Sequence, residues 1–191
     1  MILTPKALRW PYALALVCAL AAGPLLWAQH SRPTESQVKA AYLYGFGRFV
    51  QWPAPANSPK DSPFNICVLG EDPFGATLDA TLAGQSLAGR KVAARRISSP
   101  KDSSACQILF LGPSEEGQLS EIIGSLDKAA ILTVSDMPHF TERGGMIQFV
   151  LEGDRVRFEV NLTAAQNAGL SLSAELLQVA LAVRKDAAAR N

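Results

Sequence analysis

The segment FNICVLG at residues 64–70 is a short apolar run that stops at a glycine. Two later segments share this design: CQILFLG at residues 106–112 also stops at a glycine, and AILTVSD at residues 130–136 stops at a serine and an aspartate. Short continuous apolar runs bounded by turn residues are typical of strands buried on both faces of a parallel sheet. The three segments therefore predict the centre of such a sheet.

Helical segments follow the first two of these strands. Asp72 and Pro73 have the character of an N-cap and a first helical residue, which predicts a helix ending near Leu82. Ser114 is followed by two glutamates, which favour a helix N-terminus, and predicts a second helix. A weaker strand is expected at residues 91–97. Alternating strands and helices imply right-handed crossovers and helices layered on the sheet.

The last part of the chain changes character. Residues 146–151 and 156–162 flank Gly153 and Asp154, and apolar and polar residues alternate in the second arm, which predicts an antiparallel hairpin. On the packed face of a last helix, capped by Ser173, we expect Leu176, Val179, Ala180 and Val183. The predicted fold is a single layered α/β domain with a mainly parallel sheet flanked by helices and a C-terminal antiparallel hairpin.

An unusually aromatic helix precedes these strands. Thr34 and Gln37 form the pattern of a capping box, so the helix is predicted to begin there and to end near Phe49, before a Trp-Pro pair. The helix and the residues just after it contain more aromatic side chains than one core-facing side needs. These residues are Tyr42, Tyr44, Phe46, Phe49 and Trp52. Two interpretations remain open: some of them form an exposed partner surface, or the helix is buried on two sides.

The first 28 residues have the features of a secretory signal peptide. Lys6 and Arg9 precede an apolar run, and no acidic residue lies in this segment. We therefore predict a signal peptide at residues 1–28 and an α/β domain at residues 29–191. The alternatives are a retained membrane anchor, because the apolar run is almost long enough to span a bilayer, and lipidation at Cys18, whose flanking residues make a poor lipobox.

Export would place the mature chain in the bacterial periplasm, which is an oxidising compartment. Without Cys18 the chain has two cysteines, Cys67 and Cys106, and cysteines in such a compartment are more often paired than free. A disulfide between them is predicted to be structural and to stabilise the fold by about 4 kcal/mol on the chain-entropy model. The alternative is a pair of buried thiols that never meet.

Composition and motifs argue against catalysis. The chain has 191 residues and a formal net charge of +1, with no basic excess that would indicate nucleic-acid binding. His139 follows the third strand and lies near Ser135 and Asp136, but no nucleophile-elbow pattern accompanies them. No cluster of histidine, cysteine and acidic residues has zinc spacing, and the glycine turn at residues 70–75 is not a phosphate loop. We therefore expect no enzyme activity, no catalytic residue, no metal and no cofactor.

The order of motifs along the chain resembles a known family. The run VKAAYLYGFGRFVQWP at residues 38–53 is similar to the opening helix of the YfiR-like periplasmic proteins. Later matches follow in the family's order: ICVLG at 66–70, GRKV at 89–92, CQILF at 106–110, GMI at 145–147, FEVN at 158–161 and GLSLSAELL at 169–177. The resemblance rests on the order and spacing of these pieces, which together cover nearly all of the mature chain.

This resemblance implies a function that the composition does not. It implies a periplasmic regulatory protein that binds the periplasmic region of an inner-membrane diguanylate cyclase and represses it, which lowers cyclic di-GMP and disfavours biofilm. It also implies an α/β fold, a homodimer, and a family disulfide that Cys67 and Cys106 match. A second family cysteine pair, just before the final hairpin, is missing from this sequence.

The alternative interpretation is a periplasmic small-molecule binding module of a transport or sensor system. Its pocket is expected beyond Gly70, Gly112 and Ser135, because ligands often bind at the carboxyl ends of parallel strands. An exposed aromatic face on the first helix would favour a protein partner, whereas a deep pocket near Asp136 would favour a ligand.

Overall fold

A computed structural model describes residues 32–53 and 62–185 of the chain. The expected signal peptide, residues 1–28, lies outside these ranges. Within them, no helix is both long enough and apolar enough to cross a membrane.

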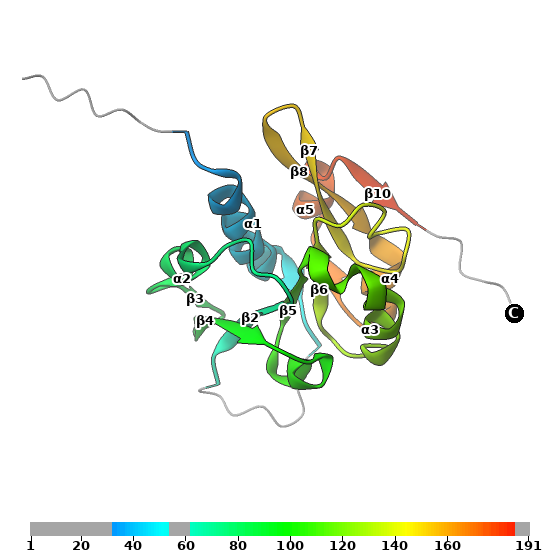
Figure 1. Ribbon diagram of the computed structural model, residues 1–191, viewed down its shortest axis with the longest axis horizontal. Helices are drawn as coiled ribbons and strands as arrows, with labels where there is room; N and C mark the ends of the chain where they lie inside the picture. The colour runs from blue at the N-terminus through cyan, green and yellow to red at the C-terminus, as the bar shows by residue number, and fades with distance from the viewer. Residues whose placement is uncertain (1–31, 54–61, 186–191) are drawn as a thin grey trace, which may run out of the picture. The chain divides into compact units, whose positions relative to one another are not determined.

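The predicted parallel sheet is confirmed (Figure 1). Its strand order is β10-β8-β7-β6-β5-β2-β4-β3, and the three apolar runs form its centre as β2 (Phe64–Leu69), β5 (Ile108–Leu111) and β6 (Leu132–Ser135). These strands run parallel to one another, and β4 (Arg90–Ile97) lies parallel to β2 on its other side. Every residue of β2, β5 and β6 is buried, as the continuous apolar pattern predicts.

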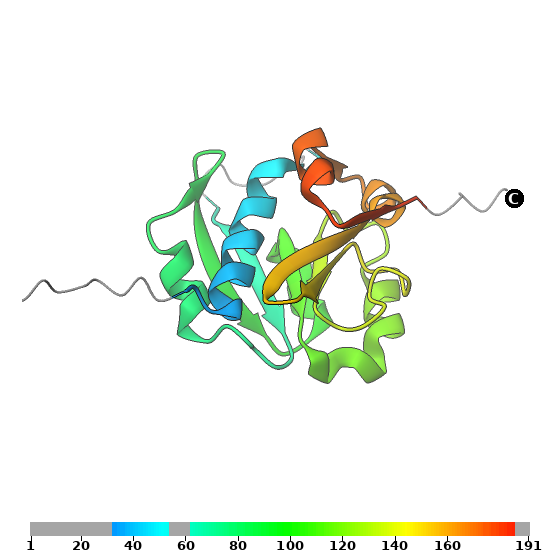
Figure 2. The same ribbon diagram turned by 90° about the horizontal axis from the view of Figure 1, so that it is seen from above.

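Alternate residues of the central strands belong to two different cores. Ile66 and Phe110 pack in the core that includes helix α1 (Glu35–Phe49), whereas Cys67 and Leu109 pack in the core that includes α3 (Leu119–Ser125). Because side chains alternate across a strand, this division means that helices cover both faces of the sheet. Figure 2 shows α1 between α2 (Ala76–Leu82) and α5 (Ala174–Val179), and all three helices contribute to the same core.

The helix starts differ from the sequence-based expectation in two places. The capping box at Thr34 is confirmed, but α2 begins at Ala76 and not beside Asp72. The Asp72 carboxylate accepts hydrogen bonds from the amides of Phe74 and Gly75, and this local turn delays the helix. Before α3 the chain first forms the tighter 3₁₀ helix η3 (Pro113–Gln118).

The C-terminal part adds the predicted hairpin and several short elements. The hairpin consists of β7 (Ile147–Glu152) and β8 (Arg155–Asn161), paired antiparallel along their whole length. The shorter elements of the chain are β1 (Val50–Gln51), β3 (Ser86–Leu87), η2 (Pro100–Ala105), α4 (Leu162–Asn167), β9 (Ser171–Leu172) and β10 (Ala182–Arg184). β1 and β9 pair in a separate two-stranded sheet.

The expected extent of the last helix is wrong. α5 ends at Val179, Ala180 adopts an extended conformation, and Val183 lies in β10. β10 pairs in parallel with β8, so the backbone hydrogen bonds available at the edge of the sheet replace those of another helical turn. The side chains of Val179 and Val183 are therefore exposed and do not form a packed face.

The predicted disulfide joins Cys67 in β2 to Cys106, which follows η2 and precedes β5. The two Cα atoms are 5.9 Å apart, and both side chains are buried in the core beneath α3. The bond ties the middle of the central strand to the entrance of its neighbour, across a sequence separation of 39 residues.

Removal of this bond should lower stability without changing the fold. The double variant Cys67→Ala and Cys106→Ala is expected to lose about 4 kcal/mol of unfolding free energy, because the unfolded chain regains the entropy of an open loop. Urea unfolding of the variant and of the wild type, with and without reductant, measures the loss. A variant as stable as the oxidised wild type would show that the bond contributes nothing.

Candidate functional site

Two of the five aromatic residues, Phe46 and Tyr42, pack against the β7–β8 hairpin. Phe46 is buried and stacks on Phe149, with Phe158 edge-on at 5.2 Å between ring centroids. Tyr42, which is half-buried, contacts the same two phenylalanines. Phe46 therefore cannot contact a partner, which corrects its inclusion in the expected partner surface. For these two residues, the aromatic excess reflects packing against the hairpin.

The other three aromatic residues lie toward the end of α1. Phe49 is 40% exposed, which is high for a large apolar side chain. Tyr44 and Trp52 are half-buried. The Trp52 Nε1 donates a hydrogen bond of 3.2 Å to the carbonyl of Gln107, and its ring packs edge-on against Phe64. This end of the helix leaves Phe49 and parts of its neighbours accessible.

A groove of about 700 Å³ lies beside this helix end. Its lining includes Trp52, Phe64, Arg48 and Arg90, and none of the described residues that line it is acidic. The Arg90 guanidinium lies over the Phe64 ring and donates to the carbonyls of residues 62 and 63. Aromatic and arginine side chains are enriched at protein interfaces. We call Phe49 and this groove the helix-end surface.

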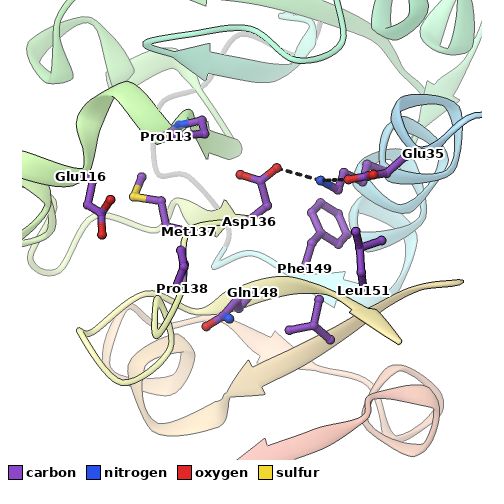
Figure 3. A pocket seen from close by; sticks show the side chains of 11 residues that line it. Glu35, Pro113, Glu116, Asp136, Met137, Pro138, Gln148, Phe149 and Leu151 are labelled. Atoms are coloured by element: carbon purple, nitrogen blue, oxygen red, sulfur yellow. Dashed lines mark hydrogen bonds and ion pairs between the residues drawn. The ribbon is translucent and has the colours of Figure 1, made fainter. Parts of the chain in front are cut away.

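A second pocket, of about 460 Å³, lies at the carboxyl ends of the parallel strands (Figure 3). Ser135 at the end of β6 pairs with Gln148, so β7 continues past β6 and forms one wall. The first turns of α1 and the segments after β5 and β6 form the others. We call this the strand-end pocket, and its lining residues are Glu35, Lys39, Pro113, Glu116, Asp136, Met137, Pro138, Gln148, Phe149, Val150 and Leu151. It lies beyond β5 and β6, as the alternative interpretation expected, but Gly70 is not part of it.

A buried lysine, Lys39, links two walls of the strand-end pocket. Lys39 is only 6% exposed, and its Nζ lies 2.7 Å from Asp136 Oδ2 and 2.5 Å from Glu35 Oε1. Burial is the largest single influence on its pKa and opposes the charged form, but the hydrogen bonds and the Coulombic attraction of Asp136 and Glu35 together outweigh it. The pKa of Lys39 therefore lies above its ordinary value. The charged lysine joins α1 to the sheet edge.

Two polar groups of the pocket lack a partner among the described residues. Asp136 Oδ1 is buried and receives no hydrogen bond. Gln148 accepts a bond from the amide of Thr141 through Oε1, while no described residue accepts one from its Nε2. Of the two, Asp136 Oδ1 is the buried atom, and a buried polar group without a partner is costly and uncommon in folded proteins.

Ser135, Asp136 and His139 do not form the contacts of a nucleophile and its base. Asp136 pairs with Lys39 and not with His139, whose exposed ring contacts Glu142 at 3.1 Å. The Ser135 hydroxyl is buried, donates to the carbonyl of Leu111 and accepts from the amide of Met137. Among the described residues, no group of three histidine, cysteine or acidic side chains is placed to hold a metal ion.

Lys39 is the site residue that sequence reasoning missed. A signal for it exists, because Lys39, Leu43 and Phe46 share one face of α1 at helical spacing and all three are buried. A lysine on an apolar helix face requires a carboxylate partner. Nothing in the sequence identifies Asp136, which lies 97 positions away.

A family model matches most of the chain. Residues 36–181 match the model of the family described as YfiR/HmsC-like. A solved conserved domain protein from Vibrio cholerae aligns with a TM-score of 0.52 at 12% identity, covering 81% of this chain and 62% of that one. An ABC domain in complex with L-Trp from Streptococcus pneumonia aligns with a TM-score of 0.45 at 12% identity, over 63% and 55%. The Vibrio likeness shows a shared fold.

Loss of the buried lysine should destabilise the protein more than loss of its exposed partner. Lys39→Met leaves the Asp136 carboxylate without its ion pair, and we expect a loss of about 2 kcal/mol of unfolding free energy. Glu35→Gln, in which the half-exposed carboxylate is lost, should cost less than about 1 kcal/mol. Urea unfolding of both variants measures the difference, and equal losses would contradict the role assigned to Asp136.

The ion pair between Lys39 and Asp136 should stop stabilising the protein at strongly alkaline pH. Because the folded pKa of Lys39 is raised, its stabilising effect is complete below its ordinary pKa of 10.5 and is lost as the pH rises through the folded value. The stability difference between the wild type and Lys39→Met should therefore stay constant at neutral pH and shrink above about pH 10.5. Urea unfolding across an alkaline pH series checks this, and a difference that already shrinks near neutral pH would contradict it.

Proposed function

The chain belongs to the YfiR/HmsC-like family, and we propose that it is a periplasmic regulatory protein that binds the periplasmic region of an inner-membrane diguanylate cyclase and represses it. The observation that carries the proposal is the family match over residues 36–181. Repression would lower cyclic di-GMP and disfavour biofilm. The homodimer that the resemblance implies is part of the same proposal, and analytical ultracentrifugation tests it.

The buried disulfide supports the proposed location. A bond between Cys67 and Cys106 forms and persists in an oxidising compartment such as the periplasm. The family assignment agrees with that location, and the predicted signal peptide at residues 1–28 would supply the route.

The helix-end surface supports binding to a protein partner. Phe49 offers an exposed aromatic side chain, and the adjacent groove contributes Trp52 and two arginines. Such a surface would bind an acidic or aromatic segment of the cyclase. Repression requires that it bind the inactive conformation of the cyclase more tightly than the active one, because only differential affinity shifts such an equilibrium.

A second candidate function is favoured by one observation, the strand-end pocket. Its volume of about 460 Å³ suits a small ligand, and its place at the carboxyl ends of parallel strands is where such ligands often bind. A small-molecule binding module of a transport or sensor system would use this pocket.

The direct test of the first function measures cyclic di-GMP in cells that lack the gene. The level is expected to rise on deletion and to return when the exported protein is supplied, but not when a form without residues 1–28 is supplied. A level that stays unchanged on deletion, while a membrane cyclase is expressed, would refute the proposed repression.

A variant pair locates the partner surface within the same experiment. Phe49→Glu places a charge on the helix-end surface and should weaken partner binding about tenfold or more, so that cyclic di-GMP remains high. Val179→Glu is the matched control, because it changes another exposed apolar residue, at the end of α5. Full repression by Phe49→Glu would exclude this surface.

A further inference from the structure

The strand-end pocket has a charge and a lining that define a class of ligand. We propose that it binds a small organic ammonium ion with an apolar body and a neutral hydrogen-bond acceptor at its other end. This inference rests on the second candidate function, ligand binding, and is independent of cyclase repression.

The charge of the pocket favours a cation. Three carboxylates line it, from Glu35, Glu116 and Asp136. Two cations face them: Lys39 inside the pocket, and Arg143, which contacts Glu116 at 3.2 Å. Among the described residues one negative charge therefore remains uncompensated, which attracts an ammonium group and repels an anion.

The buried lysine is not available to bind an anion. Its ammonium is held by Glu35 and Asp136 and lies 5.9 Å from the centroid of the Phe149 ring. An anionic ligand would have to displace a carboxylate from it. The binding energy would then be offset by an ion pair broken within the protein.

The Asp136 carboxylate supplies the acceptor for the ammonium. Oδ2 faces Lys39, and Figure 3 shows the other oxygen directed away from it, on the side of Pro113 and Met137. That oxygen, Oδ1, receives no hydrogen bond from any described residue. The side chain is 21% exposed, and the final torsion of a carboxylate is soft, so a small rotation presents Oδ1 to the pocket. A ligand N–H would satisfy it.

The opposite wall determines the rest of the ligand. Gln148 is 9% exposed, and its free Nε2 group can donate to a hydroxyl or carbonyl oxygen. Met137, Phe149 and Val150 provide apolar surface between the two polar ends. A ligand carboxylate at the Gln148 end would be repelled by the uncompensated negative charge, so the acceptor should be neutral.

A set of three related compounds tests this class. Tyramine carries an ammonium at one end, a neutral phenol hydroxyl at the other and an aromatic ring between them; 4-ethylphenol lacks the ammonium, and 4-(2-aminoethyl)benzoate carries a carboxylate in place of the hydroxyl. In calorimetric and amide NMR titrations of the disulfide-bonded protein, we expect tyramine to bind about tenfold more tightly than either of the others. The shifted amides should lie at residues 136–137 and 148–151.

Three variants connect the binding to the pocket. Asp136→Asn should weaken tyramine binding about tenfold, and Glu35→Gln should weaken it about threefold through the lost charge. Asp127→Asn removes an exposed carboxylate after α3 and should leave binding unchanged. Thermal melts verify folding, and Glu35→Gln keeps the test valid should Asp136→Asn unfold.

Several outcomes would overturn the proposal: equal binding of 4-ethylphenol, tighter binding of 4-(2-aminoethyl)benzoate, amide shifts elsewhere, or full affinity in both pocket variants. Absence of tyramine binding would also overturn it. None of these results bears on repression of the cyclase, which is measured separately by the cyclic di-GMP level.

Discussion

The burial of β2, β5 and β6 on both faces is the constraint on which the rest of the structure depends. Each of these strands has apolar side chains above and below the sheet, so helices have to cover both sides. The strand ends must also lie close together. A Cβ atom on Gly112 would lie 2.2 Å from the carbonyl oxygen of Glu71, so the turn after β5 can rest on the turn after β2 only with glycine.

Local patterns predicted the elements that this constraint governs. The three apolar runs predicted the central strands, and the capping box at Thr34 predicted the start of α1, because both signals lie within a few residues. The disulfide was predictable because two cysteines remained in an oxidising compartment. The end of α5 was not predictable from the sequence. Val183 pairs with β8 at the edge of the sheet, and no local pattern reveals this pairing.

The candidate site depends on contacts between distant segments, and here the sequence was less informative. Phe46 and Phe49 are indistinguishable in a list of aromatic residues, yet one packs on Phe149 and the other is exposed. Their difference is set by which side of α1 faces the hairpin. Lys39 and Asp136 likewise meet because α1 crosses the end of β6, which is a consequence of the assembled fold.

Helix α1 connects the two surfaces that carry the proposals. Its first turns line the strand-end pocket through Glu35 and Lys39, and the chain beyond its other end contacts the entrances of β2 and β5 through Trp52. An ammonium at Asp136 has to share that carboxylate with Lys39, so ligand binding alters a contact that fixes one end of the helix. If ligand binding changes the affinity of the helix-end surface for its partner, partner binding must change the ligand affinity by the same factor. The stacking of Phe46 on Phe149 holds the middle of the helix, so coupling between the two ends requires movement of α1 as a rigid unit and not unwinding within it.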